Sequence, residues 1–388
     1  MLKDQGLIRI ANAGVDDIRL NKISIASSRN KRFDRINTVS WFLPVVTHAL
    51  KGGVRTVFTF AEKMSRRWGT VNVFVMYSHN GADFDIQEIS NSLSQYFPKM
   101  RFVIRKFISG KTSIDEIPQT EIGLCTLWTT AYLLLKYNRV VKKFYFMQDY
   151  EPLFYEAGSI YAAIEQTYRF GFSCIANTPG VGNRYLSYSS DMVSFYPGVD
   201  TSVFFPSNHH RSPNRTRRVV FYGRPGNARN CFSLGVMTLQ ALKRKMKDKV
   251  EIISVGADWD VNQYGLQGVV ENRGLLNSLS EVADLYRSAD VGLVFMATPH
   301  PSYQPLEYMA CGCIVATNIN EANRWLLDDD NSIQVEPVPE IAAQKILEAL
   351  KDDARMSRLR SQALTKIADY TWDSAYSVFE KRILGVEN

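Results

Sequence analysis

Residues 219–230 of the chain have the sequence VVFYGRPGNARN. Four apolar or aromatic residues at 219–222 predict a short buried strand, and the glycines and proline that follow predict a loop. The next stretch, 232–247, has the length and pattern of a helix. A buried strand, a loop and a helix in this order form the repeating unit of an open parallel α/β sheet.

The same alternation continues to the end of the chain. Further strands are predicted at 251–255, 269–271, 291–295 and 314–317. Further helices are predicted at 279–288, 339–351, 355–367 and 372–384. The last of these carries Trp372, Tyr376, Phe379 and Ile383 on one face. This half therefore predicts one parallel sheet with helices on both faces.

The first half shows a similar pattern. Its predicted strands lie at 38–43, 71–77, 101–107, 122–126, 143–147, 173–176 and 192–196. The run at 71–77 is largely apolar, which is typical of a strand buried on both faces. Apolar residues at helical spacing predict a helix over 54–68. Residues 1–35 are polar and predict an irregular N-terminal extension.

A break in this pattern separates the two halves. Prolines at 197 and 206 bracket it, and residues 207–217 are polar and charged, which favours a domain boundary. We expect an extension at 1–35, Rossmann-like domains at 36–198 and 199–367, and a terminal segment at 368–388. Two facing sheets of this kind form a cleft, and open α/β sheets bind ligands outside the carboxyl ends of their strands.

Charge and composition narrow the choice of partner. The chain has 388 residues, a formal net charge of +7 and a pI near 9.0, which favours an anionic partner such as a nucleotide, a membrane surface or nucleic acid. No apolar run reaches the roughly 18 residues of a membrane span, and the start lacks a signal-peptide pattern. We therefore expect a cytoplasmic protein. Basic clusters at 29–35, 211–218 and 243–249 raise the alternatives of peripheral contact with an anionic membrane and of a plain solvated surface.

The loop after residue 222 holds the first candidate site. Gly223 lets the backbone approach a ligand, and Arg224 and Arg229 can donate hydrogen bonds to phosphate oxygens. The N-terminal end of the next helix adds ~0.3–1 kcal/mol, whereas a hydrogen bond to a charged group contributes ~1.5–3 kcal/mol. The arginines should therefore dominate. The alternative is a basic surface loop with a turn glycine.

The stretch at 301–317, PSYQPLEYMACGCIVAT, holds the second candidate site. It predicts a short helix that carries Glu307 in its first turn, where the carboxylate can accept hydrogen bonds from sugar hydroxyls. The backbone N–H groups of Ser302 and Tyr303 can face a phosphate. The alternative is a glutamate that only complements the helix dipole.

The first half offers further candidates. Gly52 and Gly53 follow the first predicted strand and could let the backbone approach the donor or the acceptor, although a plain turn explains them equally well. Asp149 follows the predicted strand at 143–147. It is the best candidate for a contact to an acceptor hydroxyl or for its proton acceptor, with a helix-capping carboxylate as the alternative.

Four stretches of the chain resemble the GT-B glycosyltransferases, in particular the retaining glycosyltransferase family 4. They are FYPGVD at 195–200 with Phe204 and Pro206, Gly223-Arg224 with Arg229, LY at 285–286 with ADV at 289–291, and LEYMACG at 306–312. The resemblance implies two facing doubly wound domains, a C-terminal helix that crosses back to the first domain, and retaining transfer of a sugar from a nucleotide diphosphate.

Three further stretches resemble bacterial polysaccharide rhamnosyltransferases, including those that build S-layer glycans. They are QDYEPLF at 148–154, GRPG at 223–226 and HPSY at 300–303. This resemblance implies dTDP-β-L-rhamnose as donor and a lipid-linked rhamnan-type oligosaccharide or polysaccharide as acceptor. The chain departs from the wider family at Pro299, where a second glutamate usually contacts the donor sugar, and near Asn277, where a lysine is usual.

These departures keep other functions open. A donor linked to UDP or GDP is the main alternative, and a non-catalytic nucleic-acid-binding protein is a more distant one. Because aromatic residues do not interleave the basic clusters, no nucleic-acid partner is expected.

Sugar transfer leaves negative charge on the diphosphate, and a divalent metal or fixed cations must stabilise it. The five cysteines and five histidines lack the paired spacing of a metal site. We expect Arg224 and Arg229 to supply the positive charge, so that transfer needs no metal and no other cofactor.

Overall fold

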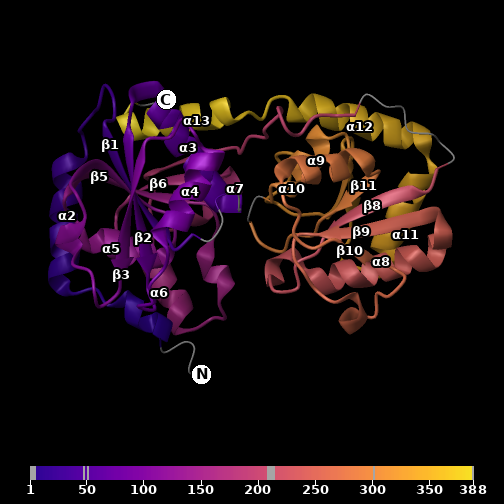
Figure 1. The fold of residues 1–388 in the computed structure, drawn as a ribbon, viewed down its shortest axis with the longest axis horizontal. Coiled ribbons are helices and arrows are strands. Elements are labelled where there is room, and N and C mark those ends of the chain that lie inside the picture. The colour runs from indigo at the N-terminus through magenta and orange to yellow at the C-terminus, as the bar shows by residue number, and fades with distance from the viewer. Residues whose placement is uncertain (1–5, 47–48, 50–51, 208–214, 300–301, 387–388) are drawn as a thin grey trace. The chain divides into compact units, whose positions relative to one another are not determined.

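The computed structural model describes residues 6–46, 49, 52–207, 215–299 and 302–386. The chain divides into two units, each built around its own sheet (Figure 1). Unit one contains Met1–Tyr196 and Ala375–Asn388, and unit two contains Pro197–Ser374.

Unit one is built on a parallel sheet with seven described strands. They are β1 (Thr38–Pro44), β2 (Val71–Ser78), β3 (Phe102–Ile108), β4 (Thr120–Cys125), β5 (Val140–Met147), β6 (Ser173–Asn177) and β7 (Met192–Phe195). Their order is β3-β2-β1-β4-β5-β6-β7. The helices between them are α3 (Gly52–Trp68), α4 (Ile86–Tyr96), α5 (Trp128–Lys136), α6 (Ser159–Thr167) and α7 (Pro179–Tyr185). Each predicted strand of this half is present, with ends shifted by up to three residues.

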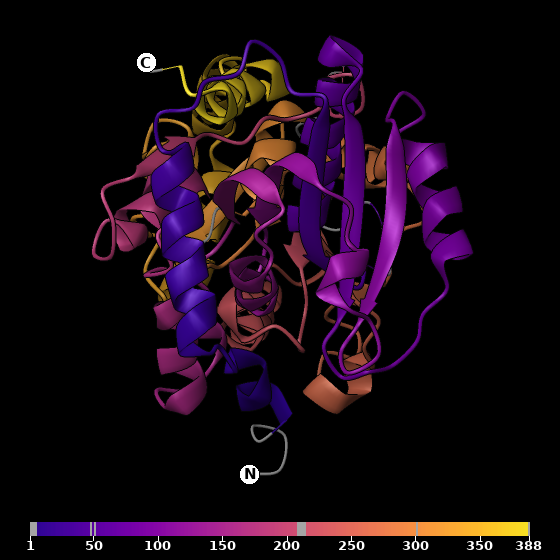
Figure 2. The ribbon, with the colours of Figure 1, turned by 90° about the vertical axis from the view of Figure 1, so that its left-hand side faces the viewer.

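The prediction of an irregular segment over residues 1–35 is wrong for its middle part. Val15–Ser28 form helix α2, which contacts α5 and β5 beside the sheet (Figure 2). The side chain of Asn21 donates a hydrogen bond to the carbonyl of Phe170 at 2.8 Å and accepts one from Lys143 Nζ at 2.9 Å. This polar contact and the packing of Ile18 and Ile25 against the core hold α2 in place. The other apolar residues of α2 are exposed, so its sequence lacks the periodic apolar face that predicts a helix.

Unit two is built on a second parallel sheet, with six described strands. They are β8 (Arg217–Tyr222), β9 (Val250–Val255), β10 (Glu271–Asn272), β11 (Val291–Leu293), β12 (Ile314–Asn318) and β13 (Ser332–Val335). Their order is β10-β9-β8-β11-β12-β13. The helices are α8 (Phe232–Met246), α9 (Leu279–Ser288), α10 (Gln304–Ala310), α11 (Pro339–Lys351) and α12 (Asp353–Ile367). Strand β13 was not predicted, because its short run follows three aspartates.

Both faces of the second sheet are covered. Val219 and Phe221 of β8 pack in one core with α8 and α11, and Val220 packs in another with α9, α10 and α12. Successive residues of a strand point to opposite faces, so this alternation requires helices on both sides. The doubly wound class expected from the sequence is confirmed.

Helix α13 (Trp372–Leu384) begins in unit two and continues in unit one from Ala375. In unit one the ring of Phe379 stacks on that of Trp41, with centroids 5.8 Å apart, and also packs against Phe60 and Phe146. Phe379 is fully buried. Tyr376, Phe379 and Ile383 of the face predicted for this helix are therefore buried in unit one, whereas Trp372 lies in unit two.

Candidate functional site

The strand order of unit two reverses beside β8, which pairs with β9 on one side and β11 on the other. At such a point the loops after neighbouring strands separate and leave a crevice at the carboxyl edge of the sheet. The loops after β8 and β11 contain most of the candidate residues of this half.

Gly223 directly follows strand β8, at a position where neighbouring atoms leave no space for a side chain. Its N–H donates to the carbonyl of Val255 at 2.9 Å, and its own carbonyl accepts from Trp259 Nε1 at 3.3 Å. A Cβ atom at this position would lie 2.3 Å from Ser254 Oγ, closer than real Cβ contacts. The loop needs glycine here because another strand end approaches the backbone.

Arg224 extends along the ring of Tyr222. Its Nη1 donates to Tyr222 Oη at 3.2 Å, and its guanidinium lies 5.8 Å from the ring centroid. Gly256, with φ of +112°, borders the same side chains, and a Cβ there would lie 2.7 Å from Tyr222 and 3.3 Å from Arg224. Half-buried Arg224 is thus held at the carboxyl edge between the ends of β8 and β9.

Arg229 lies in a short 3-10 turn, Ala228–Asn230, before helix α8. Its carbonyl accepts from the N–H of Ala297 at 3.1 Å, and Asn230 Nδ2 contacts Met296 Sδ at 3.4 Å. Because Ala297 and Met296 follow β11, these contacts join the loops after β8 and β11.

The end of β12 and the loop after it also contact the loop after β11. Asn318 Nδ2 and Asn320 Nδ2 donate to the carbonyl of Met296 at 2.8 Å and 2.7 Å. The segment that bears Arg229 is therefore positioned by two other strand ends rather than lying as an unattached surface loop.

Helix α10 carries Glu307 in its first turn, as predicted, and the side chain is half-buried. Burial, with Glu307 nearby, raises the pKa of Tyr308 well above its usual value. Ser302 is buried and its hydroxyl bonds to Gln304. The ring of Tyr303 stacks on Trp372 with a centroid distance of 6.1 Å. Positions 300 and 301 of the HPSY stretch lie outside the described residues.

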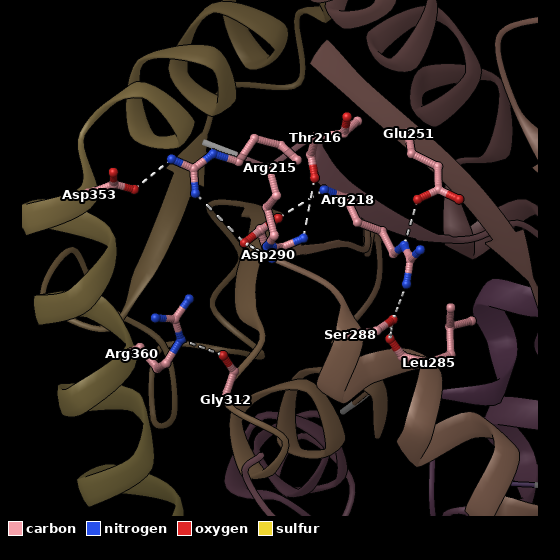
Figure 3. A network of polar contacts seen from close by, with 11 residues as sticks. Arg215, Thr216, Arg218, Glu251, Leu285, Ser288, Asp290, Gly312, Asp353 and Arg360 are labelled. Carbon is pink, nitrogen blue, oxygen red and sulfur yellow. Dashed lines mark hydrogen bonds and ion pairs between the residues drawn. The ribbon is translucent and has the colours of Figure 1, made fainter. Parts of the chain in front are cut away.

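A second group of arginines in unit two lies at the opposite end of β8 and is paired with carboxylates (Figure 3). Arg215 Nη2 lies 2.6 Å from Asp290 Oδ1, and Arg218 Nε lies 2.7 Å from Glu251 Oε2. Arg217 Nη2 lies 2.5 Å from Asp353 Oδ1. These three residues are the described part of the basic cluster at 211–218, and they stabilise the domain rather than presenting unpaired charge.

In unit one the structure brings Gly53 and the loop after β5 together. Gln148 Nε2 donates to the carbonyl of Gly53 at 2.6 Å, and a Cβ on Gly53 would lie 3.0 Å from the Gln148 amide. Asp149 follows directly, is 5% exposed, and accepts from the N–H of Tyr150 at 2.8 Å. Gly52 begins helix α3, and the residues at 50 and 51 before it lie outside the described chain.

Glu151, which the sequence analysis did not single out, lies beside Asp149 and is 2% exposed. Its carboxylate accepts from the N–H of Trp128 at 2.6 Å and from Tyr145 Oη at 3.1 Å. Burial raises the pKa of Glu151 to about 8, and the nearby charge of Asp149 acts in the same direction. No local sequence signal marks this burial, because Leu153 and Phe154, which follow Glu151 closely, are exposed.

Two kinds of feature are absent from the described residues. No three or more His, Cys, Asp or Glu side chains gather there in an arrangement that could hold a metal ion. Within the same residues, no helix has the length and apolar content needed to cross a membrane.

Known proteins resemble this chain in sequence and in fold. Residues 217–351 match the family model described as the C-terminal domain of WsaF. Solved structures match nearly the whole chain at low identity. HepE of Anabaena, in complex with UDP-glucose, has a TM-score of 0.70 and 12% identity, covering 89% of this chain and 100% of that one. The chain has the fold of the GT-B glycosyltransferases.

Two further proteins resemble this chain, one in its structure and one in its sequence. Sucrose-phosphate synthase from Thermosynechococcus elongatus has a TM-score of 0.66 and 13% identity, covering 89% of this chain and 98% of that one. The O-antigen biosynthesis protein RfbC of Myxococcus xanthus is 39% identical over 355 residues, which are 90% of this chain. The chain spans 27% of the length of that relative.

Proposed function

We propose that this GT-B chain transfers a sugar, with retention of configuration, from a nucleotide diphosphate to a growing cell-surface polysaccharide. Arg224 and Arg229 on the loops at the strand-order reversal of unit two carry the proposal. The similarity to an O-antigen biosynthesis protein supports the polysaccharide as product class. The WsaF domain match and the sequence resemblance support L-rhamnose, donated from dTDP-β-L-rhamnose, as the sugar.

The proposed step breaks one bond and forms one. The bond between the anomeric carbon of the sugar and a β-phosphate oxygen breaks, and its electron pair stays on the phosphate. An acceptor hydroxyl oxygen bonds to the anomeric carbon on the same face, and its proton passes to the departing phosphate oxygen. Positive groups that are already in place at the diphosphate lower the barrier, because they need no rearrangement as its charge grows.

The arginines are proposed to take the part that a divalent metal takes in other transferases. Gly223 lets the backbone come close to the diphosphate, and the N–H groups of Ser302 and Tyr303 add hydrogen bonds. Glu307 accepts a hydrogen bond from a hydroxyl of the donor. Transfer by this arrangement needs no metal. Full activity in the presence of a chelator is the expected result, and a loss that magnesium restores would refute it.

Unit one is proposed to bind the acceptor, which we take to be a lipid-linked glycan. Asp149 contacts the reacting hydroxyl, and the backbone at Gly52 and Gly53 borders the same place. The protein would act in the cytoplasm at the inner membrane face, with its basic clusters at 29–35 and 243–249 against anionic lipid. Salt-sensitive co-sedimentation with anionic liposomes is the expected observation.

Another nucleotide sugar is the main competing donor, since HepE was solved with UDP-glucose and TarM of S. aureus with UDP. A panel of dTDP-, UDP- and GDP-linked sugars decides between them. Turnover with UDP- or GDP-sugars and none with dTDP-rhamnose would replace the donor and leave the reaction class intact.

Calorimetric titration with thymidine diphosphate tests the site itself. Arg224→Ala should weaken binding by about tenfold to a hundredfold, because a hydrogen bond to a charged group contributes ~1.5–3 kcal/mol. Arg244→Ala is the matched control, since it removes a 65% exposed arginine from helix α8 of the same unit. Equal affinity in both variants would remove Arg224 from the site.

A further inference from the structure

Unit one contains a cavity of about 380 Å³ beside helix α4. Val45, Val46 and Ala49, which follow β1, line it together with residues 84–96, which include helix α4. Its apolar base includes Val46, Ala49, Ile89 and Leu93, all of which are buried. Binding pockets for small molecules typically measure roughly 300–1,000 Å³. The cavity is therefore large enough for one sugar ring.

The charged residues that line the cavity in the described part of the chain are acidic. Asp85, the N-cap residue of α4, and Glu88, in its first turn, are exposed. Asp85 uses one carboxylate oxygen to cap the helix, accepting from the N–H of Gln87 at 2.7 Å. The neighbouring cation, Lys106, lies over the ring of Phe84 at 5.3 Å and pairs with Asp83 at 2.6 Å. Among the described lining residues the formal charge is negative, although the whole chain is positive.

We propose that this cavity binds one uncharged sugar residue of the acceptor chain. A pyranose has a face of C–H groups that fits the apolar base and the aromatic residues Phe84 and Tyr96, which also line the cavity. Its hydroxyls are donors for the carboxylates of Asp85 and Glu88. The same carboxylates repel a phosphate, so the lipid diphosphate end of an acceptor does not enter. This inference rests on the proposed transferase function and assigns the sugar part of its acceptor.

A pair of tryptophan substitutions on α4 tests the cavity. Ser92 lines it and is half-buried, whereas Ser94 is exposed and is not among its lining residues. The probe is methyl α-L-rhamnopyranoside, detected by saturation-transfer difference NMR on the full chain. Wild type and Ser94→Trp should bind it, and Ser92→Trp should bind it at least about tenfold more weakly, a change of ~1.4 kcal/mol. Equal binding by the two variants, or none by wild type, would overturn the inference.

A charge reversal provides a second test that does not depend on filling the cavity. Glu88→Lys should weaken binding of the methyl glycoside, and Gln87→Lys, an exposed neighbour outside the lining, should not. Vesicles of neutral and anionic phospholipid distinguish the other occupants. If Ser92→Trp abolishes vesicle binding and leaves sugar binding unchanged, the cavity is a lipid site and the inference is wrong.

The outcome is separable from the proposed function. Titration of the same variants with thymidine diphosphate reports only on unit two. Sugar binding without nucleotide binding would refute the donor site and leave the cavity assignment standing. Nucleotide binding without sugar binding would refute the cavity assignment and leave the donor site standing.

Discussion

The two sheets have the same strand order around their first strands, β3-β2-β1-β4-β5-β6 in unit one and β10-β9-β8-β11-β12-β13 in unit two. Their carboxyl edges nevertheless differ in charge. The charged candidates of unit two are Arg224 and Arg229 together with Glu307, whereas unit one contributes the buried carboxyl groups of Asp149 and Glu151 and no arginine or lysine candidate. The same strand order thus places arginine candidates, which suit a departing diphosphate, in unit two, and the Asp149 carboxyl group, which suits a hydroxyl, in unit one.

Removing both cations should give the largest effect. If each arginine contributes ~1.5–3 kcal/mol through charged hydrogen bonds, Arg224→Ala with Arg229→Ala should lower donor kcat/KM by about 10²–10⁴-fold. Steady-state kinetics with varied donor measures this loss. The acceptor KM should stay within about twofold, because the change leaves unit one intact. A shift confined to the acceptor KM would exchange the roles assigned to the two units.

The reciprocal change in unit one is Asp149→Asn. We expect a loss of roughly 10–100-fold in acceptor kcat/KM, from one charged hydrogen bond, with unchanged affinity for thymidine diphosphate. Asp16→Asn, which changes an exposed carboxylate on α2 of the same unit, is the control. Weaker nucleotide binding in Asp149→Asn would contradict the assignment of the donor to unit two and of the acceptor to unit one.

Glu151 should make the stability of unit one depend on pH. Burial raises its pKa in the folded protein to about 8, from an ordinary value of 4.5. The protonated form favours folding, so this stabilisation is complete below about pH 4.5 and is lost as pH rises through about 8. Glu151→Gln, a neutral mimic, should therefore be more stable than wild type at pH 9, by on the order of a few kcal/mol, and close to it at pH 4.5.

Urea unfolding at the two pH values measures this difference. Glu165→Gln, in the same unit, is the control. It should not show the gain in stability at high pH that is expected of Glu151→Gln. An equal gap between wild type and Glu151→Gln at both pH values would show that Glu151 titrates normally.

The smallest effect concerns Trp259, whose Nε1 bonds to the carbonyl of Gly223. Its ring packs edge-on with Phe232 and Tyr264, at centroid distances of 5.0 and 5.5 Å. Trp259→Phe keeps an aromatic ring and removes one hydrogen bond worth ~0.5–1.5 kcal/mol. Donor binding should weaken by about twofold to tenfold, with little change in kcat. Tyr264→Phe, which keeps the same ring, should leave donor binding as it is.

Local pattern predicted much of this architecture. The strand, glycine loop and helix around Gly223 are present as expected, because apolar runs bounded by turn residues determine both elements. The polar contact that fixes α2 through Asn21 was missed, since it joins residues more than a hundred positions apart. Glu151 was missed for a similar reason, because only tertiary packing shows that this carboxyl is buried. The cavity beside α4 depends on two separate segments and has no signature in either.

The ring of Trp41 is synthesised long before that of Phe379, which covers it in the folded protein. A nascent chain completes strands β1 to β7 long before residues 375–386 are made, and all of unit two lies between them. Until then the aromatic surface formed by Trp41, Phe60 and Phe146 has no cover from the end of the chain. Exposed apolar surface of this kind is where partly made proteins aggregate. The N-terminal sheet should therefore need chaperone protection during translation, although its strands are made first.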